Sequence, residues 1–188
     1  MMQQAKKREE QAIVLDFLPN GYVSDKRPSH LKTAIAQAVG TERFTILELV
    51  PRKGLFLQPY EEVYIGVEKR EKIHHVNGKI PYEKLTETAK AELPHLVAQL
   101  VEQREEFFVD FLNKAQPLNT RMHSIELLPG IGKKHMWEIL EERREGPFKS
   151  FSDMRERVKL MPDPKLMFAK RITDELMGKE KRFLFTDP

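Results

Sequence analysis

The stretch LLPGIGKKHMWEIL, residues 127–140, gives the strongest indication of the fold of this chain. It places Gly130 and Gly132 on either side of one isoleucine and continues directly into two lysines. Glycine has no Cβ, so it lets the backbone turn sharply and approach another group closely. The chain has only 9 glycines in 188 residues. A pair at this spacing therefore predicts a tight turn at the start of a helix.

The apolar residues around this turn follow a frame that recurs 33 residues later. The first copy runs over residues 125–139 and the second over residues 158–172. The second copy keeps the apolar positions but has Asp163 and Lys165 where the first has glycines. The spacing resembles the helix-hairpin-helix motif. Two such hairpins, joined by a helix around residues 152–158, resemble the double helix-hairpin-helix domain of DNA repair and recombination proteins.

A helix-hairpin-helix turn points backbone N–H groups outward, together with those of the next helix N-terminus, and so forms a small anion site. A nucleic-acid phosphate suits such a site, and Lys133 and Lys134 add charge-assisted contacts. These contacts reach only the backbone of the nucleic acid, so they give affinity with little sequence preference. The resemblance further implies that the carbonyl oxygens of Glu126, Leu128 and Ile131 bind a monovalent cation, and no other cofactor is expected.

Composition narrows the function further. The net charge is +3, and the whole excess lies in residues 121–188, which carry 15 Lys and Arg against 12 Asp and Glu. The absence of cysteine excludes disulfides, Cys-ligated metals and thiol catalysis. No run approaches the ~20 apolar residues that a membrane-spanning helix needs, and the first residues lack an apolar signal core. The sequence therefore predicts a cytoplasmic protein without membrane contact.

The first eighty residues contain five short β-type runs between positions 12 and 76, separated by turn signals. Asn77-Gly78 follows the last run and is typical of a hairpin turn. Such a series predicts a small OB-like β-barrel, although an SH3-like barrel leaves the same pattern. The loop over residues 51–62 is expected to be exposed and to offer Arg52 and Lys53 to a ligand.

Helical periodicity begins after this part. Apolar residues recur at three- and four-residue intervals over 93–112, with Pro94 expected to begin or kink the helix. The predicted class is α+β, with an OB-like barrel over residues 1–80. A connecting helical segment follows over 81–120, and an all-α part containing the hairpin pair covers 121–188.

The pairing of such a barrel with LLPGIGKK (127–134) and GPFKSFSDMRERV (146–158) resembles an uncharacterised archaeal family described as nucleotide- or RNA-binding proteins. The likeness extends over nearly the whole chain and is firmest over residues 125–176. It implies the barrel and the hairpin module but no established activity.

Other readings of single motifs favour structure over chemistry. Lys134 and Asp153 have roughly the spacing of the catalytic pair in helix-hairpin-helix glycosylases, but Ser152 and Asp153 fit the cap and first turn of a helix. His74-His75 are neighbours on a strand and should point to opposite faces, which disfavours a metal pair. A lone Trp137 on a helix is expected in a core or an interface.

The sequence thus predicts a non-enzymatic nucleic-acid-binding protein, with RNA preferred over DNA. The second hairpin is expected to act mainly as structure. A protein–protein adaptor that uses the hairpins as a scaffold is the alternative, and a glycosylase-like repair enzyme is a remote one. The predicted nucleic-acid-binding residues are Gly130, Ile131, Gly132, Lys133, Lys134, Lys165, Lys170, Arg171, Arg52 and Lys53.

Overall fold

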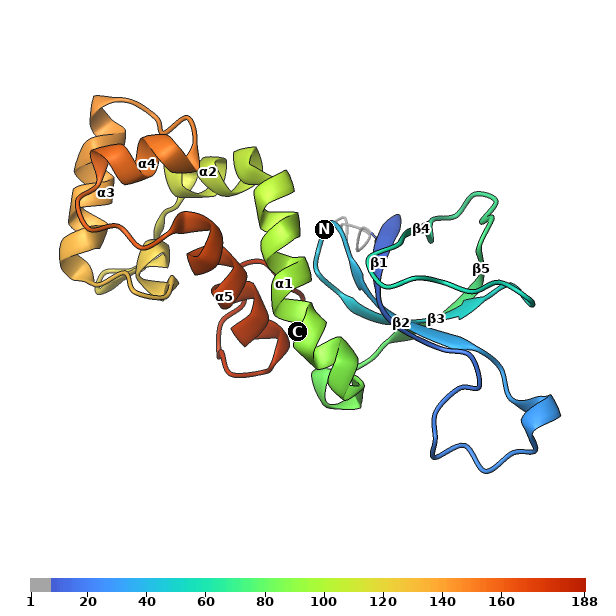
Figure 1. Cartoon of the computed structure of the whole chain (residues 1–188). Coiled ribbons are helices and arrows are strands. Elements are labelled where there is room, and N and C mark those ends of the chain that lie inside the picture. The colour runs from blue at the N-terminus through green and yellow to red at the C-terminus, as the bar shows by residue number, and fades with distance from the viewer. Residues whose placement is uncertain (1–7) are drawn as a thin grey trace, which may run out of the picture. The chain divides into compact units, whose positions relative to one another are not determined.

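The computed structural model describes residues 8–188, which form two compact units (Figure 1). The first unit contains the described residues up to Leu96 together with Asp174–Pro188, and the second contains Val97–Thr173. The class is mixed α+β, as predicted. The three segments proposed from the sequence as domains stay a prediction.

A curled five-stranded sheet forms the first unit (Figure 1). The strand order is β4-β1-β2-β3-β5, and every neighbouring pair is antiparallel. β4 and β5 are the two edges, so the sheet is a half-barrel. Each of the five predicted β-type runs overlaps one strand. The strands are β1 (Gln11–Leu18), β2 (Ile35–Gly40), β3 (Ile46–Pro51), β4 (Glu62–Tyr64) and β5 (Ile73–Lys79).

Asn77 and Gly78 do not form the predicted hairpin turn, because both lie within β5. Val76 pairs with Leu49 and Gly78 pairs with Glu48, so Asn77 is the extra residue of a β-bulge. Gly78 has φ +130°, a conformation that glycine adopts without strain. A bulge bends its strand and increases the local twist, which helps the sheet to curl.

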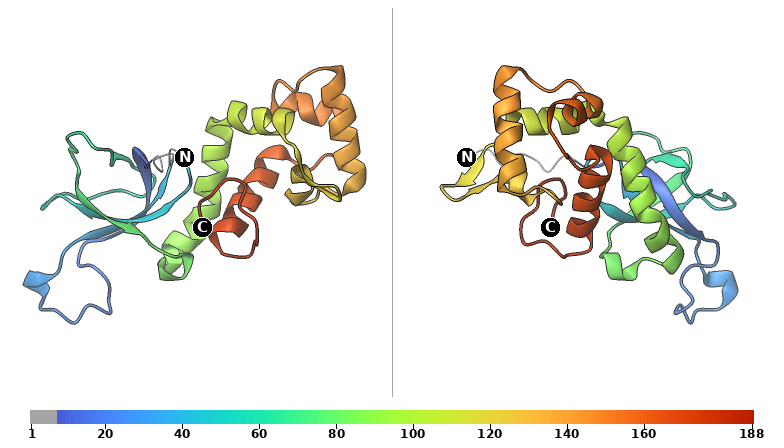
Figure 2. Two further views of the ribbon diagram at one scale, coloured as in Figure 1. Left: turned by 180° about the vertical axis from the view of Figure 1, so that it is seen from behind. Right: turned by 60° about the vertical axis from the view of Figure 1, so that its left-hand side comes forward.

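The connection between β1 and β2 is a long loop over residues 19–34 that contains one 3₁₀ turn, η1 (Ser29–Leu31). It extends beyond the two strands in both views of Figure 2. The Tyr22 hydroxyl donates to a Glu48 carboxylate oxygen on β3 at 2.5 Å and ties the loop to the sheet. Burial and this hydrogen bond raise the pKa of Tyr22 to about 12.

Residues 174–188 complete the first unit from the other end of the chain. The Glu175 side chain is 2% exposed, and its carboxylate accepts hydrogen bonds of 2.8–3.1 Å from the backbone N–H groups of residues 184–186. Asp187 then forms a 2.7 Å ion pair with Arg43 beside β3. The buried carboxylate therefore holds residues 184–186 at the end of α5, and the ion pair joins the tail to the sheet.

The predicted helical texture beyond residue 80 is present. α1 begins where the Thr86 hydroxyl accepts a hydrogen bond from the Ala89 N–H at 3.0 Å. Pro94 lies inside this helix, so of the two predicted alternatives it does not begin the helix, and a kink there stays a prediction. The helices are η2 (Tyr82–Lys84), α1 (Glu87–Gln103), α2 (Glu105–Lys114), η3 (Ser124–Leu127), α3 (Lys133–Glu145), α4 (Phe151–Arg157) and α5 (Pro164–Leu176).

The C-terminal part is not all-α as predicted. A two-stranded ribbon of β6 (Pro117–Asn119) and β7 (Met122–His123) lies between α2 and η3. The Asn119 side chain accepts a hydrogen bond from the Arg121 N–H at 2.8 Å and closes the turn. A ribbon this short has too few residues to show a β-type sequence pattern.

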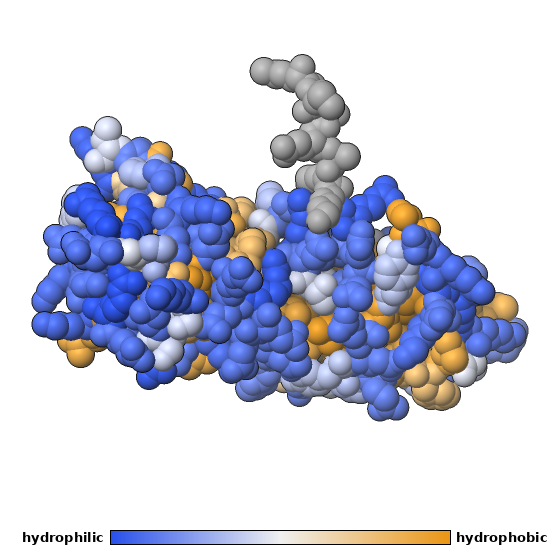
Figure 3. Space-filling model, turned by 90° about the horizontal axis from the view of Figure 1, so that it is seen from above, coloured by the Kyte–Doolittle hydropathy of each residue, from blue (hydrophilic) through white to orange (hydrophobic). Residues whose placement is uncertain are grey.

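Aromatic rings hold the helices of the second unit together. Phe168 on α5 lies 4.8 Å from Phe108 on α2 and 6.0 Å from Phe151 on α4, measured between ring centroids. Rings at such distances add to the free energy gained from burial alone. On the face drawn in Figure 3, the hydrophobic patches of the described residues are bordered by hydrophilic side chains.

Candidate nucleic-acid interface

The first hairpin begins with a capped single turn. His123 precedes η3, and its Nδ1 accepts a hydrogen bond from the Ile125 N–H at 3.2 Å. The Glu126 carboxylate accepts one from the His123 N–H at 2.7 Å, which completes a capping box. Burial and the positive charge of Arg143 lower the pKa of His123, although Glu126 opposes them. The shift favours the neutral ring, whose Nδ1 can accept this hydrogen bond. Sequence reasoning missed this cap, because histidine is not a usual N-cap residue.

Gly130 has two structural reasons to be glycine. Its φ is +77°, which side-chain-bearing residues rarely adopt. A Cβ built at this position would lie 3.1 Å from Pro162 Cγ. The turn of the first hairpin therefore packs directly against the loop of the second, with Gly130 at the contact. Ile131, the next predicted site residue, is buried in the core.

Gly132 differs from Gly130 in both respects. It is the N-cap of α3, with φ −89° and ψ −179°, and a Cβ there would meet nothing within 4 Å. Its carbonyl oxygen accepts the Met136 N–H at 3.0 Å, so the helix starts in the usual way. No side chain caps the first turn. The start of α3 is thus open to a group from outside the chain.

Lys133 and Lys134 are the first two residues of α3, and both are exposed. The N-terminal end of a helix carries a partial positive charge, so each cation there costs about 0.3–1 kcal/mol. The first turn holds no acidic residue, and neither lysine has a carboxylate partner among the described residues. The hairpin therefore accumulates positive charge that the described part of the chain does not neutralise.

The second hairpin differs from the first at its helix start. α4 ends at Arg157 and α5 begins at Pro164, so residues 158–172 are not one uninterrupted helix. The N-cap of α5 is Asp163. In the 33-residue repeat the N-cap Gly132 corresponds to Lys165, so the second helix begins two residues earlier than the repeat predicts. Asp163 Oδ1 accepts the Leu166 N–H at 3.1 Å. The chain's own carboxylate thus caps the first turn of α5, whereas no side chain caps the first turn of α3.

The three predicted cations of the second hairpin have different surroundings. Lys165 forms a 2.8 Å ion pair with Glu102, and Lys170 is exposed. Arg171 is only 2% exposed, and its Nη1 donates to the Leu127 carbonyl oxygen at 2.9 Å. The expectation that Arg171 contacts nucleic acid is therefore wrong, because its guanidinium holds the end of η3.

Arg171 also bears on the predicted monovalent cation. Its guanidinium binds the carbonyl oxygen of Leu127. Leu127 lies between Glu126 and Leu128, which are two of the three residues expected to bind the cation. The Leu128 carbonyl oxygen also accepts the Ile131 N–H at 3.2 Å. A fixed positive charge and a hydrogen bond at these carbonyls both weaken their attraction for a further cation.

Two more arginines of this unit bind helix ends. Arg143 on α3 donates to the carbonyl oxygens of Leu112 and Ala115 at 2.9 Å, at the end of α2. Arg157 on α4 donates to the Gly146 carbonyl at 2.8 Å, at the end of α3. Cations are favourable at helix C-termini, where carbonyls lack partners. Part of the basic excess in residues 121–188 is therefore structural and does not by itself indicate nucleic-acid binding.

The two site residues predicted in the half-barrel lie in the loop between β3 and β4. Arg52 and Lys53 are exposed as predicted, but the Arg52 guanidinium donates to the Arg70 carbonyl oxygen at 2.8–2.9 Å. Phe56 in the same loop is 73% exposed, and its ring meets the edge of Phe17 at 5.5 Å between centroids. The loop thus presents a cation and an aromatic ring to solvent.

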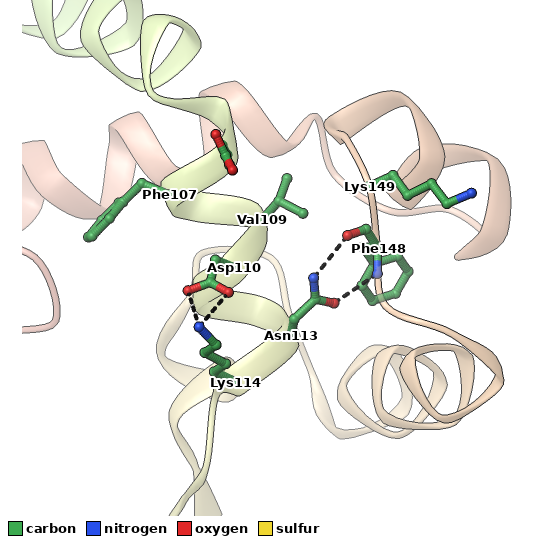
Figure 4. Close-up of a pocket in the computed structure, with 8 residues that line it drawn as sticks. Phe107, Val109, Asp110, Asn113, Lys114, Phe148 and Lys149 are labelled. Carbon is green, nitrogen blue, oxygen red and sulfur yellow. Dashed lines mark hydrogen bonds and ion pairs between the residues drawn. The ribbon is translucent and has the colours of Figure 1, made fainter.

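The predicted hairpin residues line none of three hollows that occur among residues 8–188. A hollow of about 630 Å³ lies between α2 and the α3–α4 loop (Figure 4). There Asn113 holds the Phe148 backbone through two hydrogen bonds of 2.8 and 2.9 Å, and Asp110 pairs with Lys114. The two Asn113 bonds fasten the loop to α2, whereas the ion pair lies within α2. Hollows of about 400 and 820 Å³ lie in the first unit.

His74 and His75 do not point apart as predicted. Their Nδ1 atoms lie 2.8 Å from each other, with ring centroids 5.1 Å apart. The irregular pairing of β5 with β3 brings the two rings together. No group of three or more His, Asp or Glu side chains that could hold a metal occurs among residues 8–188.

The fold is therefore a mixed α+β one, with a curled five-stranded sheet and a helical unit. The family model described as a protein of unknown function (DUF655) matches residues 8–187. MJ0038, an uncharacterised protein of Methanocaldococcus jannaschii, is 43% identical over 182 residues, which are 96% of this chain and 81% of that protein. The crystal structure of Af1531 from Archaeoglobus fulgidus, described as a DUF655 family model, is 43% identical with a TM-score of 0.88. That comparison covers 95% of this chain and 100% of that one.

The chain belongs to the DUF655 family. This confirms the predicted resemblance to an uncharacterised archaeal family, and the relatives' names assign no function. Within the described residues, no helix has the length and apolar character needed to cross a membrane.

Proposed function

We propose that this protein binds nucleic acid without catalysis, RNA in preference to DNA, through phosphate contacts at the start of α3. The observation that carries the proposal is the pair Lys133 and Lys134, which follow the uncapped Gly132 and lack carboxylate partners among the described residues. Cations at the start of a helix are repelled by the partial positive charge of the helix dipole, and a bound anion offsets this unfavourable free energy. The contacts reach the backbone only, so the binding has little sequence preference.

The contrast between the hairpins supports this location. Asp163 caps α5 with its own carboxylate, whereas α3 has glycine at the same point of the helix. The contact between Gly130 and Pro162 and the bond from Arg171 to Leu127 make the second hairpin a support for the first. This arrangement fits the double helix-hairpin-helix interpretation.

The half-barrel supports a second contact surface. Its order β4-β1-β2-β3-β5 leaves the two edge strands unpaired with each other, and the OB interpretation likewise expects a partly open five-stranded barrel. OB-type barrels bind single strands by stacking and charge. The exposed Lys53 and Phe56 supply both in one loop. The preference for RNA rests on this likeness.

The glycosylase alternative gains no support from Asp153. Its carboxylate accepts the Lys149 N–H at 2.9 Å and pairs with Arg157 at 3.3 Å. The cap of α4 is Ser150, two residues before the predicted Ser152. These contacts give Asp153 a structural role. The adaptor alternative draws on two exposed leucines of the second hairpin, Leu160 and Leu166.

A salt titration with single- and double-stranded RNA and DNA tests the proposal. For about 3–5 phosphate contacts, the slope of log affinity against log salt should be about −2 to −5. Lys133→Ala with Lys134→Ala should flatten that slope and leave the melting temperature nearly unchanged. Lys114→Ala with Lys149→Ala removes the same charge from α2 and the α3–α4 loop and serves as the control. Binding that ignores salt, or that survives the first double variant intact, would contradict the proposal.

A further inference from the structure

Trp137 is the single tryptophan of the chain, and 56% of it is exposed. Of the two places predicted for it, a core or an interface, the core is therefore excluded. Within residues 8–188 its ring packs on no other aromatic ring, and its Nε1–H has no acceptor. Tryptophan carries a large apolar surface and usually finds a partner for its N–H. An exposed tryptophan ring without such partners is suited to contact with a ligand.

Trp137 lies on the same side of α3 as the two lysines. It follows Lys133 by four residues and Lys134 by three, which is the spacing of neighbours on a helix surface. The rise along the helix between them is about 4.5–6 Å. Glu141 stands one turn beyond Trp137 and is exposed. The two lysines thus lie between the ring and the hairpin turn, and the Glu141 carboxylate lies on the other side of the ring.

The loop of the second hairpin adds to this surface. The Lys159 N–H donates to Glu138 Oε1 at 2.8 Å, which places this loop beside the second turn of α3. Leu160 is 91% exposed and has φ +53°, a strained conformation for leucine. Strain of this kind costs about 1–3 kcal/mol and is concentrated at functional sites. An apolar side chain held in solvent at such a cost contributes nothing to the described fold.

We propose that Trp137 is a stacking platform for an unpaired base of a single-stranded nucleic acid, with the exposed Leu160 in the neighbouring loop. This rests on the proposed function, since the strand's phosphates bind at Lys133 and Lys134. In a duplex each base is stacked between neighbouring base pairs, so its faces are not available to stack on an exposed tryptophan ring. In a single strand every base has a free face, and stacking on an aromatic side chain is tolerant of sequence.

A single strand also fits the charges better than a protein partner does. An exposed tryptophan can serve as the centre of a protein interface, but such centres are poor in lysine. Here Lys133, Lys134 and Lys159 are all exposed around it, and the first two have no carboxylate partner among the described residues. A strand with one phosphate per base satisfies the lysines and the ring together.

Intrinsic fluorescence tests the proposal directly, because the chain has 1 tryptophan. Short oligouridylate and oligoadenylate strands and an RNA duplex of equal length are titrated while Trp137 emission and the anisotropy of a labelled strand are both followed. Single strands should quench the emission with the same Kd that anisotropy gives. The duplex should quench it little.

Trp137→Ala should weaken single-strand binding by about 5- to 150-fold, which corresponds to the loss of one stacked base. It should leave the salt slope unchanged, because no phosphate contact is removed. Trp137→Phe should restore part of the affinity. Phe183→Ala removes another exposed aromatic ring and should have no effect.

Four results would overturn the inference. Lysine-dependent binding with unchanged emission, and with Trp137→Ala equal to the parent, would leave the proposed function standing and remove only the platform. Equal quenching by duplex would also remove it. An emission change that follows protein concentration without any strand would show that a second copy covers the ring. If no strand binds at all, the proposed function fails and the platform fails with it.

Discussion

Replacing Gly132 by alanine separates the anion site from the stability of the fold. Gly132 has a backbone conformation open to any residue, and an added Cβ meets nothing within 4 Å. Alanine restricts the unfolded chain, which stabilises by about 0.4–1 kcal/mol. It is a poorer N-cap than glycine by a similar amount. The two effects oppose each other, so the free energy of unfolding should change by less than about 1 kcal/mol.

The effect on binding should be larger. A phosphate oxygen must approach the first-turn N–H groups of α3 to about 2.9 Å, and a methyl group on residue 132 stands beside them. A hydrogen bond to a charged group contributes about 1.5–3 kcal/mol. Its loss should raise the Kd by about 10- to 150-fold. Urea denaturation gives the stability, and anisotropy of a labelled oligonucleotide gives the affinity.

Two other glycines provide the controls. Gly146 is the C-cap of the same helix, and a Cβ there also meets nothing, so Gly146→Ala should alter neither quantity much. Gly130 has φ +77° and lies against Pro162, so Gly130→Ala should destabilise the fold by about 1–2 kcal/mol. If Gly132→Ala binds every strand as tightly as the parent, the start of α3 is not the phosphate site.

Three further predictions concern stability. Arg171→Met leaves the Leu127 carbonyl without its buried donor, so the free energy of unfolding should fall by about 1–3 kcal/mol, measured in urea; an unchanged value would contradict the structural role of Arg171. Glu175→Gln should release residues 184–186, detected as faster proteolysis near the C-terminal end, whereas an equal rate would contradict the anchoring. Burial lowers the pKa of His123, so the unfolded chain binds its proton more readily. Stability should therefore fall as the pH drops from 6.5 toward the lower folded pKa, and His123→Asn should reduce this slope in pH-dependent melts.

The five strands of the sheet could be predicted because each leaves a local signal, whereas the half-barrel in place of the predicted barrel could not, because closure depends on whether β4 and β5 pair. Alternating and continuous apolar runs end at turn residues, and each run overlaps a strand. The bulge at Asn77 could not be predicted, because Asn-Gly favours a hairpin turn locally and only the pairing with β3 decides against it. The β6–β7 ribbon is too short to have a pattern.

In the candidate site, too, some residues could be placed from the sequence and others could not. Lys133 and Lys134 could be placed at a helix start, because the glycine turn and the apolar frame define where α3 begins. The burial of Arg171 could not be foreseen, since an arginine has the same place in the pattern whether water or a carbonyl receives its hydrogen bonds. Whether Trp137 lies in a core or at an interface could not be decided from the sequence for a related reason. Its position on α3 follows from the sequence, but the side of α3 that other elements cover depends on tertiary packing.

The tail held by Glu175 affects the order in which the chain folds during synthesis. Residues 97–173 form a unit from one continuous segment, so all of its parts have left the ribosome once Thr173 has emerged. The sheet is made earlier, but its unit also needs residues 174–188, including the partner of Arg43. The helical unit can therefore finish first although it is translated second, and the first unit closes only when the last residues arrive.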